Sequence, residues 1–80
     1  MEITRQHIKL LLENILPIVD LESDFLFAEL DSLDVTAILM TLSQEYGISL
    51  EAEDATPKNL KNLDSLCELV QRKLNEKQAQ

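Results

Sequence analysis

The chain has 80 residues, of which 15 are acidic and seven are basic, so its formal net charge is −8. This acidic balance excludes a nucleic-acid-binding protein, because phosphate neutralisation needs clustered Lys and Arg side chains, and the length allows one domain too small to enclose a deep catalytic cleft. The single Gly and two Pro, against about five or six Gly at ~7% average usage, predict a mostly helical domain.

The chain shows no features of an exported or membrane protein. Its lone Cys67 has no partner for an internal disulfide, and Met1-Glu2-Ile3 opens the sequence without the basic and apolar segments of a signal peptide. No apolar stretch approaches the ~18 residues that a membrane span requires. We therefore expect a stand-alone cytoplasmic monomer that binds neither membranes nor nucleic acid.

The first helix is expected over about residues 5–16. Thr4 is a suitable N-cap and Pro17 a suitable stop, and apolar residues recur between them on one helical face: Ile8, Leu11, Leu12, Ile15 and Leu16. Residues 17–30 show no helical period but are too apolar for a free linker. They predict an ordered loop packed by its own side chains.

The second helix is expected over about residues 32–46. Asp31 can cap its first turn, and Asp34 adds negative charge near the positive end of the helix dipole. Gly47 stands where a left-handed C-terminal cap is needed. The apolar stripe between these ends consists of Val35, Ile38, Leu39, Leu42 and Tyr46.

Two further helices are expected in the C-terminal part. Thr56-Pro57 predicts one short turn, which forms a small third helix, through about Leu60. Asn62 can cap a last helix over about 63–74, whose apolar stripe is Leu63, Leu66, Cys67, Val70 and Leu74. The polar tail after this helix should fray, which gives a single domain over 1–80 with an ordered core at about 3–75 and a frayed segment at 76–80.

Charge is segregated along the chain. Every basic residue lies in the first nine or last 23 positions, whereas residues 10–57 contain eleven acids and no base. A field of this kind would steer a basic protein partner toward the loop and the start of the second helix. The alternative is that the acidic loops only keep a small protein soluble.

The most informative motif for function is Leu30-Asp31-Ser32-Leu33-Asp34. A serine in the first turn of a helix lies beside unpaired backbone amides, which favour a phosphate attached to it. The string resembles the Asp-Ser-Leu motif of acyl carrier proteins, whose serine carries 4′-phosphopantetheine from coenzyme A. The resemblance makes Ser32 the attachment residue, with Asp31 and Leu33 completing the motif.

The same triplet recurs as Asp64-Ser65-Leu66, so context must distinguish the two serines. In the carrier pattern the serine follows a long loop, opens the second helix, and is followed about four turns later by an aromatic-Gly-Ile. Ser32 has all three features, with Tyr46-Gly47-Ile48 in the expected place. Ser65 is interpreted as a residue at the start of the last helix.

The resemblance covers nearly the whole chain and implies an all-α, four-helix acyl-carrier-type bundle with a short third helix. It also implies a carrier and not an enzyme: an acyl group is held as a thioester on the arm while other enzymes act on it. The implied partners are a phosphopantetheinyl transferase and enzymes that load and process acyl or aminoacyl groups. Carriers of this type can open a cleft for the attached chain, although core packing is the simpler explanation of the apolar stripes.

The sequence departs from housekeeping fatty-acid carriers, which usually have Gly-Ala where this chain has Glu29-Leu30. Acids that dock basic enzyme patches are replaced on the second helix by Ala37, Ser43 and Gln44. These departures indicate a specialised fatty-acid, polyketide or lipid-modification pathway, with recognition along the helix that is more apolar. The predicted partner-binding residues are Glu29, Asp34, Thr36, Ala37 and Met40, beside Leu33.

Other classes fit less well. A hydrolase lacks a Gly-x-Ser-x-Gly elbow, and the only His is His7 in the first helix. An EF-hand needs a Gly within an acidic loop, whereas Gly47 follows Tyr46. The acids of residues 51–54 could hold a divalent ion loosely, but a solvated turn is the preferred interpretation, so no metal site is predicted. An aminoacyl or peptidyl carrier and an unmodified carrier-like interaction module stay open as alternatives.

Overall fold

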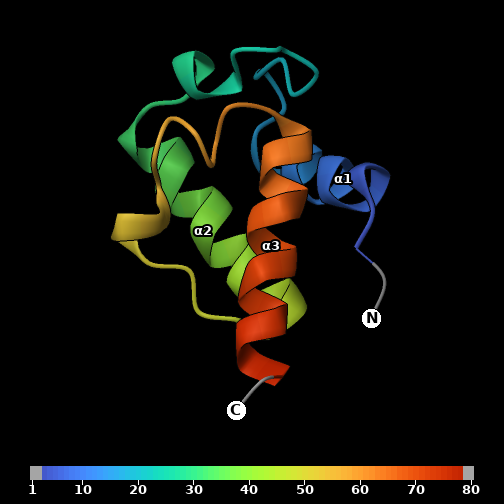
Figure 1. Cartoon of the computed structure of the whole chain (residues 1–80). Coiled ribbons are helices and arrows are strands. Elements are labelled where there is room, and N and C mark those ends of the chain that lie inside the picture. Colours follow the sequence, from blue (N-terminus) through green and yellow to red (C-terminus); the bar gives the residue numbers. More distant parts are fainter. Residues whose placement is uncertain (1–2, 79–80) are drawn as a thin grey trace.

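The computed structural model describes residues 3–78, which form three α-helices and two short 3-10 helices (Figure 1). No strand occurs among these residues, so the predicted all-α class is confirmed. The α-helices are α1 (Arg5–Ile15), α2 (Ser32–Tyr46) and α3 (Leu63–Gln78), and the 3-10 helices are η1 (Leu26–Glu29) and η2 (Ala52–Asp54).

The first two helices have the predicted caps. The Thr4 hydroxyl oxygen accepts a hydrogen bond from the His7 amide at 3.1 Å, and α1 ends one residue earlier than predicted, before Leu16 and Pro17. α2 has the predicted bounds. Gly47 ends it with φ 63° and ψ 36°, a left-handed conformation that is strained for residues with a Cβ.

Segment 56–60 makes the predicted single turn, but this turn does not extend into an α-helix. Its bonds run from the Leu60 amide to the Thr56 carbonyl at 3.0 Å and from the Asn59 amide to the Thr56 hydroxyl at 3.1 Å. Leu60 then enters the core, and the chain leads directly into the cap of α3, so the turn does not propagate. The short helix that does form is the 3-10 helix η2, earlier in the chain.

The prediction that α3 ends near residue 74 is wrong, because residues 75–78 continue the helix. The Lys77 ammonium donates a hydrogen bond to the Gly47 carbonyl, so the last turns of α3 are held against the end of α2. Residues 79–80 of the predicted frayed segment lie outside the described residues.

Apolar side chains from the three α-helices, from η1 and from the connecting segments form one core, and α1 packs against both α2 and α3. Figure 1 shows the long loop between α1 and α2 crossing the end of the bundle at which α2 and α3 begin. The buried residues are Ile8, Leu12, Leu16, Leu21, Leu26, Ile38, Leu39, Leu42, Tyr46, Leu50, Leu60, Leu63, Leu66, Leu69 and Val70. Burying them supplies the main stabilisation of the fold.

The loop over residues 17–30 is ordered, as predicted, but only part of its apolar content is packed. Leu21 and Leu26 are buried, and the Leu26 amide bonds to the Lys61 carbonyl at 2.7 Å, which ties the loop to the segment before α3. Ile18 and Phe25 are 96% and 71% exposed. The expectation that the loop buries its own side chains therefore fails for these two.

Candidate functional site

Ser32 is the first residue of α2, and the residues around it form a reciprocal capping box. The Asp31 carboxylate accepts a hydrogen bond from the Asp34 amide at 2.8 Å, while the Asp34 carboxylate accepts one from the Asp31 amide at 3.2 Å. The Thr36 hydroxyl donates to the Ser32 carbonyl at 3.0 Å. These bonds fix the backbone on both sides of Ser32.

The Ser32 side chain itself is exposed. Among the described residues its hydroxyl has no hydrogen-bond partner, and the amides of Ser32 and Leu33 have no acceptor. A phosphate on this oxygen would meet those two amides and the positive end of the α2 dipole. The site therefore suits a phosphodiester.

Ser65 lies in a different environment, although it belongs to the same triplet. It is half-buried in the first turn of α3, and both its amide and its hydroxyl donate to the Asn62 side-chain oxygen, at 2.8 and 3.1 Å. The Asn62 cap thus occupies the Ser65 hydroxyl, whereas the Asp31 cap leaves the Ser32 hydroxyl unoccupied.

An apolar groove of about 510 Å³ opens beside Ser32, between α2 and η2. Its lining residues are Phe27, Leu30, Asp31, Ser32, Val35, Thr36, Leu39, Ala52 and Ala55. A group attached to Ser32 would therefore begin at the rim of an apolar surface.

The η2 wall of this groove is held against α3 by an ion pair between Lys73 and Asp54 at 3.2 Å. Partial desolvation disfavours the ionised form of Asp54, but hydrogen bonds from the Glu51 amide and the Lys73 ammonium outweigh it and lower the pKa of Asp54. The hydrogen bond to Asp54 likewise raises the pKa of Lys73. Asp54 thus serves the capping and anchoring of η2, and no cluster of metal-ligating side chains lies within the described residues.

A second groove, of about 500 Å³, lies on the other side of the start of α2. Three acids line it, Glu29, Asp31 and Asp34, and they face the apolar residues that follow α1, including the exposed Ile18. Of the predicted partner-binding residues, Glu29 and Asp34 are therefore brought together here. Ile18 was missed, because the loop has no periodicity from which its orientation could be read.

The outward face of α2 presents the apolar residues predicted for partner contact. Leu33 is 80% exposed and Met40 57%, and Ala37 is half-buried between them. Ser43 is half-buried, and its hydroxyl accepts a hydrogen bond from the Leu50 amide at 3.0 Å.

Together, a small helical bundle, an unoccupied serine hydroxyl at a helix start and an adjacent apolar groove define a carrier-type domain. Residues 5–70 match the family model described as "Phosphopantetheine attachment site". The chain belongs to this family, and the domain is an attachment site for covalently bound 4′-phosphopantetheine. No significant match was found among curated proteins or solved structures.

Family membership establishes a phosphopantetheine-carrying protein that interacts with a phosphopantetheinyl transferase and with acyl-processing enzymes in general. Such carriers are generally not catalysts themselves.

Within residues 3–78, none of the helices combines the length and apolar character needed to cross a membrane. Cys67 is half-buried, and burial raises the pKa of its thiol, which keeps it in the unreactive protonated form.

Proposed function

We propose that Ser32 carries the arm and that the protein presents acyl intermediates as thioesters to the enzymes of a specialised fatty-acid, polyketide or lipid-modification pathway. The observation that supports Ser32 most strongly is its exposed, unpartnered hydroxyl at a rigidly capped helix start. In the loading step the Ser32 oxygen forms a bond to the diphosphate phosphorus of coenzyme A that carries pantetheine. The bond from this phosphorus to the bridging oxygen breaks, adenosine 3′,5′-bisphosphate leaves, and the hydroxyl proton passes to a base of the transferase. The bound arm then supplies a thiol for the thioester.

The other residues around Ser32 have positioning and docking roles in this proposal. Asp31 and Asp34 hold the serine backbone through the capping box and place negative charge near it. Leu33 and Met40 offer apolar contact to partner enzymes, and Glu29 with the capping acids attracts their basic side chains. Ala37 leaves this surface without the charge that general fatty-acid carriers display at the matching position, which supports a dedicated set of partners.

Intact-protein mass spectrometry after co-expression with a phosphopantetheinyl transferase tests the assignment. Wild type and Ser65→Ala should gain the mass of the arm, whereas Ser32→Ala should not. Ser32 is exposed and its hydroxyl is unpartnered, so the Ser32→Ala protein should keep the circular dichroism spectrum and melting temperature of the wild type. Modification of Ser32→Ala, or its loss only in Ser65→Ala, would reassign the site, and an unmodified wild type would favour an interaction module that is never loaded.

A further inference from the structure

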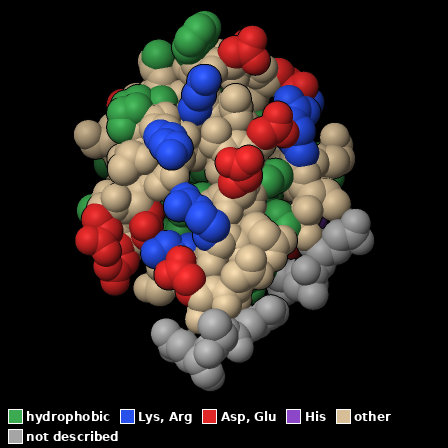
Figure 2. All heavy atoms as spheres, viewed as in Figure 1, with side chains coloured by type: hydrophobic (Ala, Val, Ile, Leu, Met, Phe, Trp, Pro, Cys, Tyr) green, Lys and Arg blue, Asp and Glu red, His purple; other side chains and the backbone are tan. Residues whose placement is uncertain are grey.

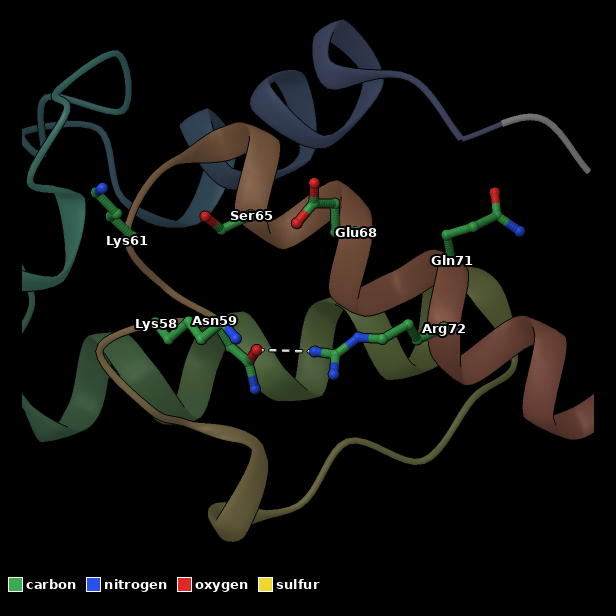
Figure 3. A pocket seen from close by; sticks show the side chains of 7 residues that line it. All are labelled: Lys58, Asn59, Lys61, Ser65, Glu68, Gln71 and Arg72. Carbon is green, nitrogen blue, oxygen red and sulfur yellow. Dashed lines mark hydrogen bonds between the residues drawn. The ribbon is translucent and has the colours of Figure 1, made fainter.

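A basic hollow of about 660 Å³ lies on the outer side of α3, and the residues that line it are far from the Ser32 motif in the sequence. Figure 3 shows Lys58, Asn59 and Lys61 on the segment before α3 and the other lining residues on the helix itself. We use the name "basic hollow" for the surface lined by Lys58, Asn59, Lys61, Ser65, Glu68, Gln71 and Arg72.

The basic hollow differs from the rest of the molecule in its charge balance. The other four basic side chains are satisfied: Arg5 by Glu22 and Asp64, Lys9 by Glu13 and Glu22, Lys73 by Asp54, and Lys77 by the Gly47 carbonyl. In the described part of the chain neither Lys58 nor Lys61 forms an ion pair, and Arg72 donates only to the neutral Asn59 amide oxygen at 2.8 Å. Three cationic groups therefore share one surface with a single carboxylate, that of Glu68.

The spacing of these groups favours an extended anionic segment over a single small anion. Figure 3 shows Lys61 beside the start of α3 and Arg72 at the other end of the surface, so the cationic groups do not converge on one point. The lysines extend the surface further into the preceding segment, as Figure 3 shows. A phosphate ion needs donors that converge on one point, whereas several carboxylates along a peptide match charges spread along a surface.

The net charge of −8 limits what kind of macromolecule can bring such a segment. Nucleic acids and anionic membranes are negative over their whole surface and would be repelled by the acidic remainder of the protein. Figure 2 shows the blue Lys and Arg side chains on this face with red Asp and Glu side chains beside them. A protein with a local acidic segment and an otherwise basic docking surface is complementary to both kinds of charge.

We propose that the basic hollow is a second docking surface, which receives an acidic segment of a partner protein whose neighbouring surface is basic. α2 and α3 begin at the same end of the bundle (Figure 1), so a partner that covers Ser32 can also reach Lys61 beside the start of α3. Opposite charges at two separate places then fix the orientation of the partner on the carrier. This inference rests on the proposed function in one respect: it takes the partner to be a protein that also docks around Ser32.

The test uses Ser32→Ala protein labelled with ¹⁵N, because it keeps every surface charge but cannot carry an arm. It is titrated with a blocked tetraglutamate peptide, with inorganic phosphate at equal concentrations, and with phosphatidylserine vesicles. Saturable amide shifts confined to residues 58–72 are expected with the peptide. Adding Lys58→Ala and Lys61→Ala should weaken this binding about tenfold, which corresponds to ~1.4 kcal/mol.

A matched control separates local contact from net charge. The lysine double variant has a net charge of −8 − 2 = −10, and Gln6→Glu with Asn14→Glu reaches the same value on exposed positions of α1. The control should retain the peptide affinity within about twofold, because it reaches the same net charge without changing any residue that lines the basic hollow.

Three outcomes would overturn the proposal. Peptide shifts that are absent at millimolar concentration, or equal in the lysine double variant, would mean that the basic hollow is not a docking surface for acidic segments. Phosphate that produces the same shifts as the peptide would indicate a simple anion site. Vesicles that bind more strongly than the peptide would indicate a membrane-facing surface. None of these outcomes depends on whether Ser32 is modified.

Discussion

The hydroxyl of Tyr46 should destabilise the folded protein, so Tyr46→Phe should raise the free energy of unfolding. The side chain is 3% exposed, and its oxygen is buried without a hydrogen-bond partner in the described structure. An unsatisfied buried polar group costs ~1–3 kcal/mol, and removing one oxygen leaves the ring packing in place. We expect a gain of about 1–2 kcal/mol, equivalent to a rise in melting temperature of roughly 4–16 °C for a domain of this size.

The pH dependence provides a second measurement of the same group. Burial, assisted by the neighbouring Glu45 carboxylate, raises the pKa of Tyr46 above its ordinary value. The stability linked to this shift is complete below about pH 10, where both folded and unfolded chains are protonated, and is lost as the pH rises through the folded-state pKa. The free energy of unfolding of the wild type should therefore lie further below that of Tyr46→Phe at about pH 10–11 than at neutral pH.

Urea unfolding followed by far-UV circular dichroism at both pH values measures these differences. Tyr46→Leu is the control, because it removes the ring that packs edge-on against His7 with centroids 6.1 Å apart. This variant should be less stable than wild type by about 1–3 kcal/mol, as for other changes of shape in a packed core. A Tyr46→Phe protein less stable than wild type at neutral pH would refute the reasoning, since the hydroxyl would then make a stabilising bond.

Two further variants test the groove wall and the docking face. Asp54→Asn should lower stability at pH 7 by about 1 kcal/mol through loss of the Lys73 ion pair, and urea unfolding should show the difference shrinking as the pH falls through the lowered pKa of Asp54. Ala37→Glu combined with Gln44→Glu should speed acylation by general fatty-acid enzymes, with a gain that declines as salt is raised. Steady-state kinetics with wild type as the reference would contradict this if the gain were absent or independent of salt.

The helices could be predicted from the sequence where their ends carry capping chemistry. Thr4 and Asp31 accept the predicted backbone hydrogen bonds, and Gly47 adopts the predicted left-handed conformation, so the bounds of α1 and α2 hold within one residue. The end of α3 has no such residue. Its extension past residue 74 accompanies a contact between Lys77 and Gly47, which are 30 positions apart in the sequence. No local pattern contains that information.

The loop between α1 and α2 shows a second limit of prediction. A helix period identifies the buried face, whereas residues 17–30 have no period, so composition indicates order but not which apolar side chains point inward. Leu26 is fully buried and the adjacent Phe25 is 71% exposed. The grooves on both sides of Ser32 depend on such orientations, which is why the exposed Ile18 beside Glu29 and Asp34 could not be predicted from the sequence.

The two Asp-Ser-Leu triplets show how a motif acquires meaning from its position relative to a helix cap. In the first triplet the aspartate is itself the cap, so Ser32 is the first helical residue and its hydroxyl stays outside the capping hydrogen bonds. In the second triplet the cap is Asn62, so Ser65 is the third residue of its helix and not the first. At this position its amide and its hydroxyl both donate to the Asn62 side-chain oxygen. The same three-residue motif therefore leaves the Ser32 hydroxyl exposed to solvent and places the Ser65 hydroxyl in a hydrogen bond with the helix cap. An attachment serine needs the first arrangement, because a hydroxyl already held by a cap would have to break that bond before it could attack phosphorus.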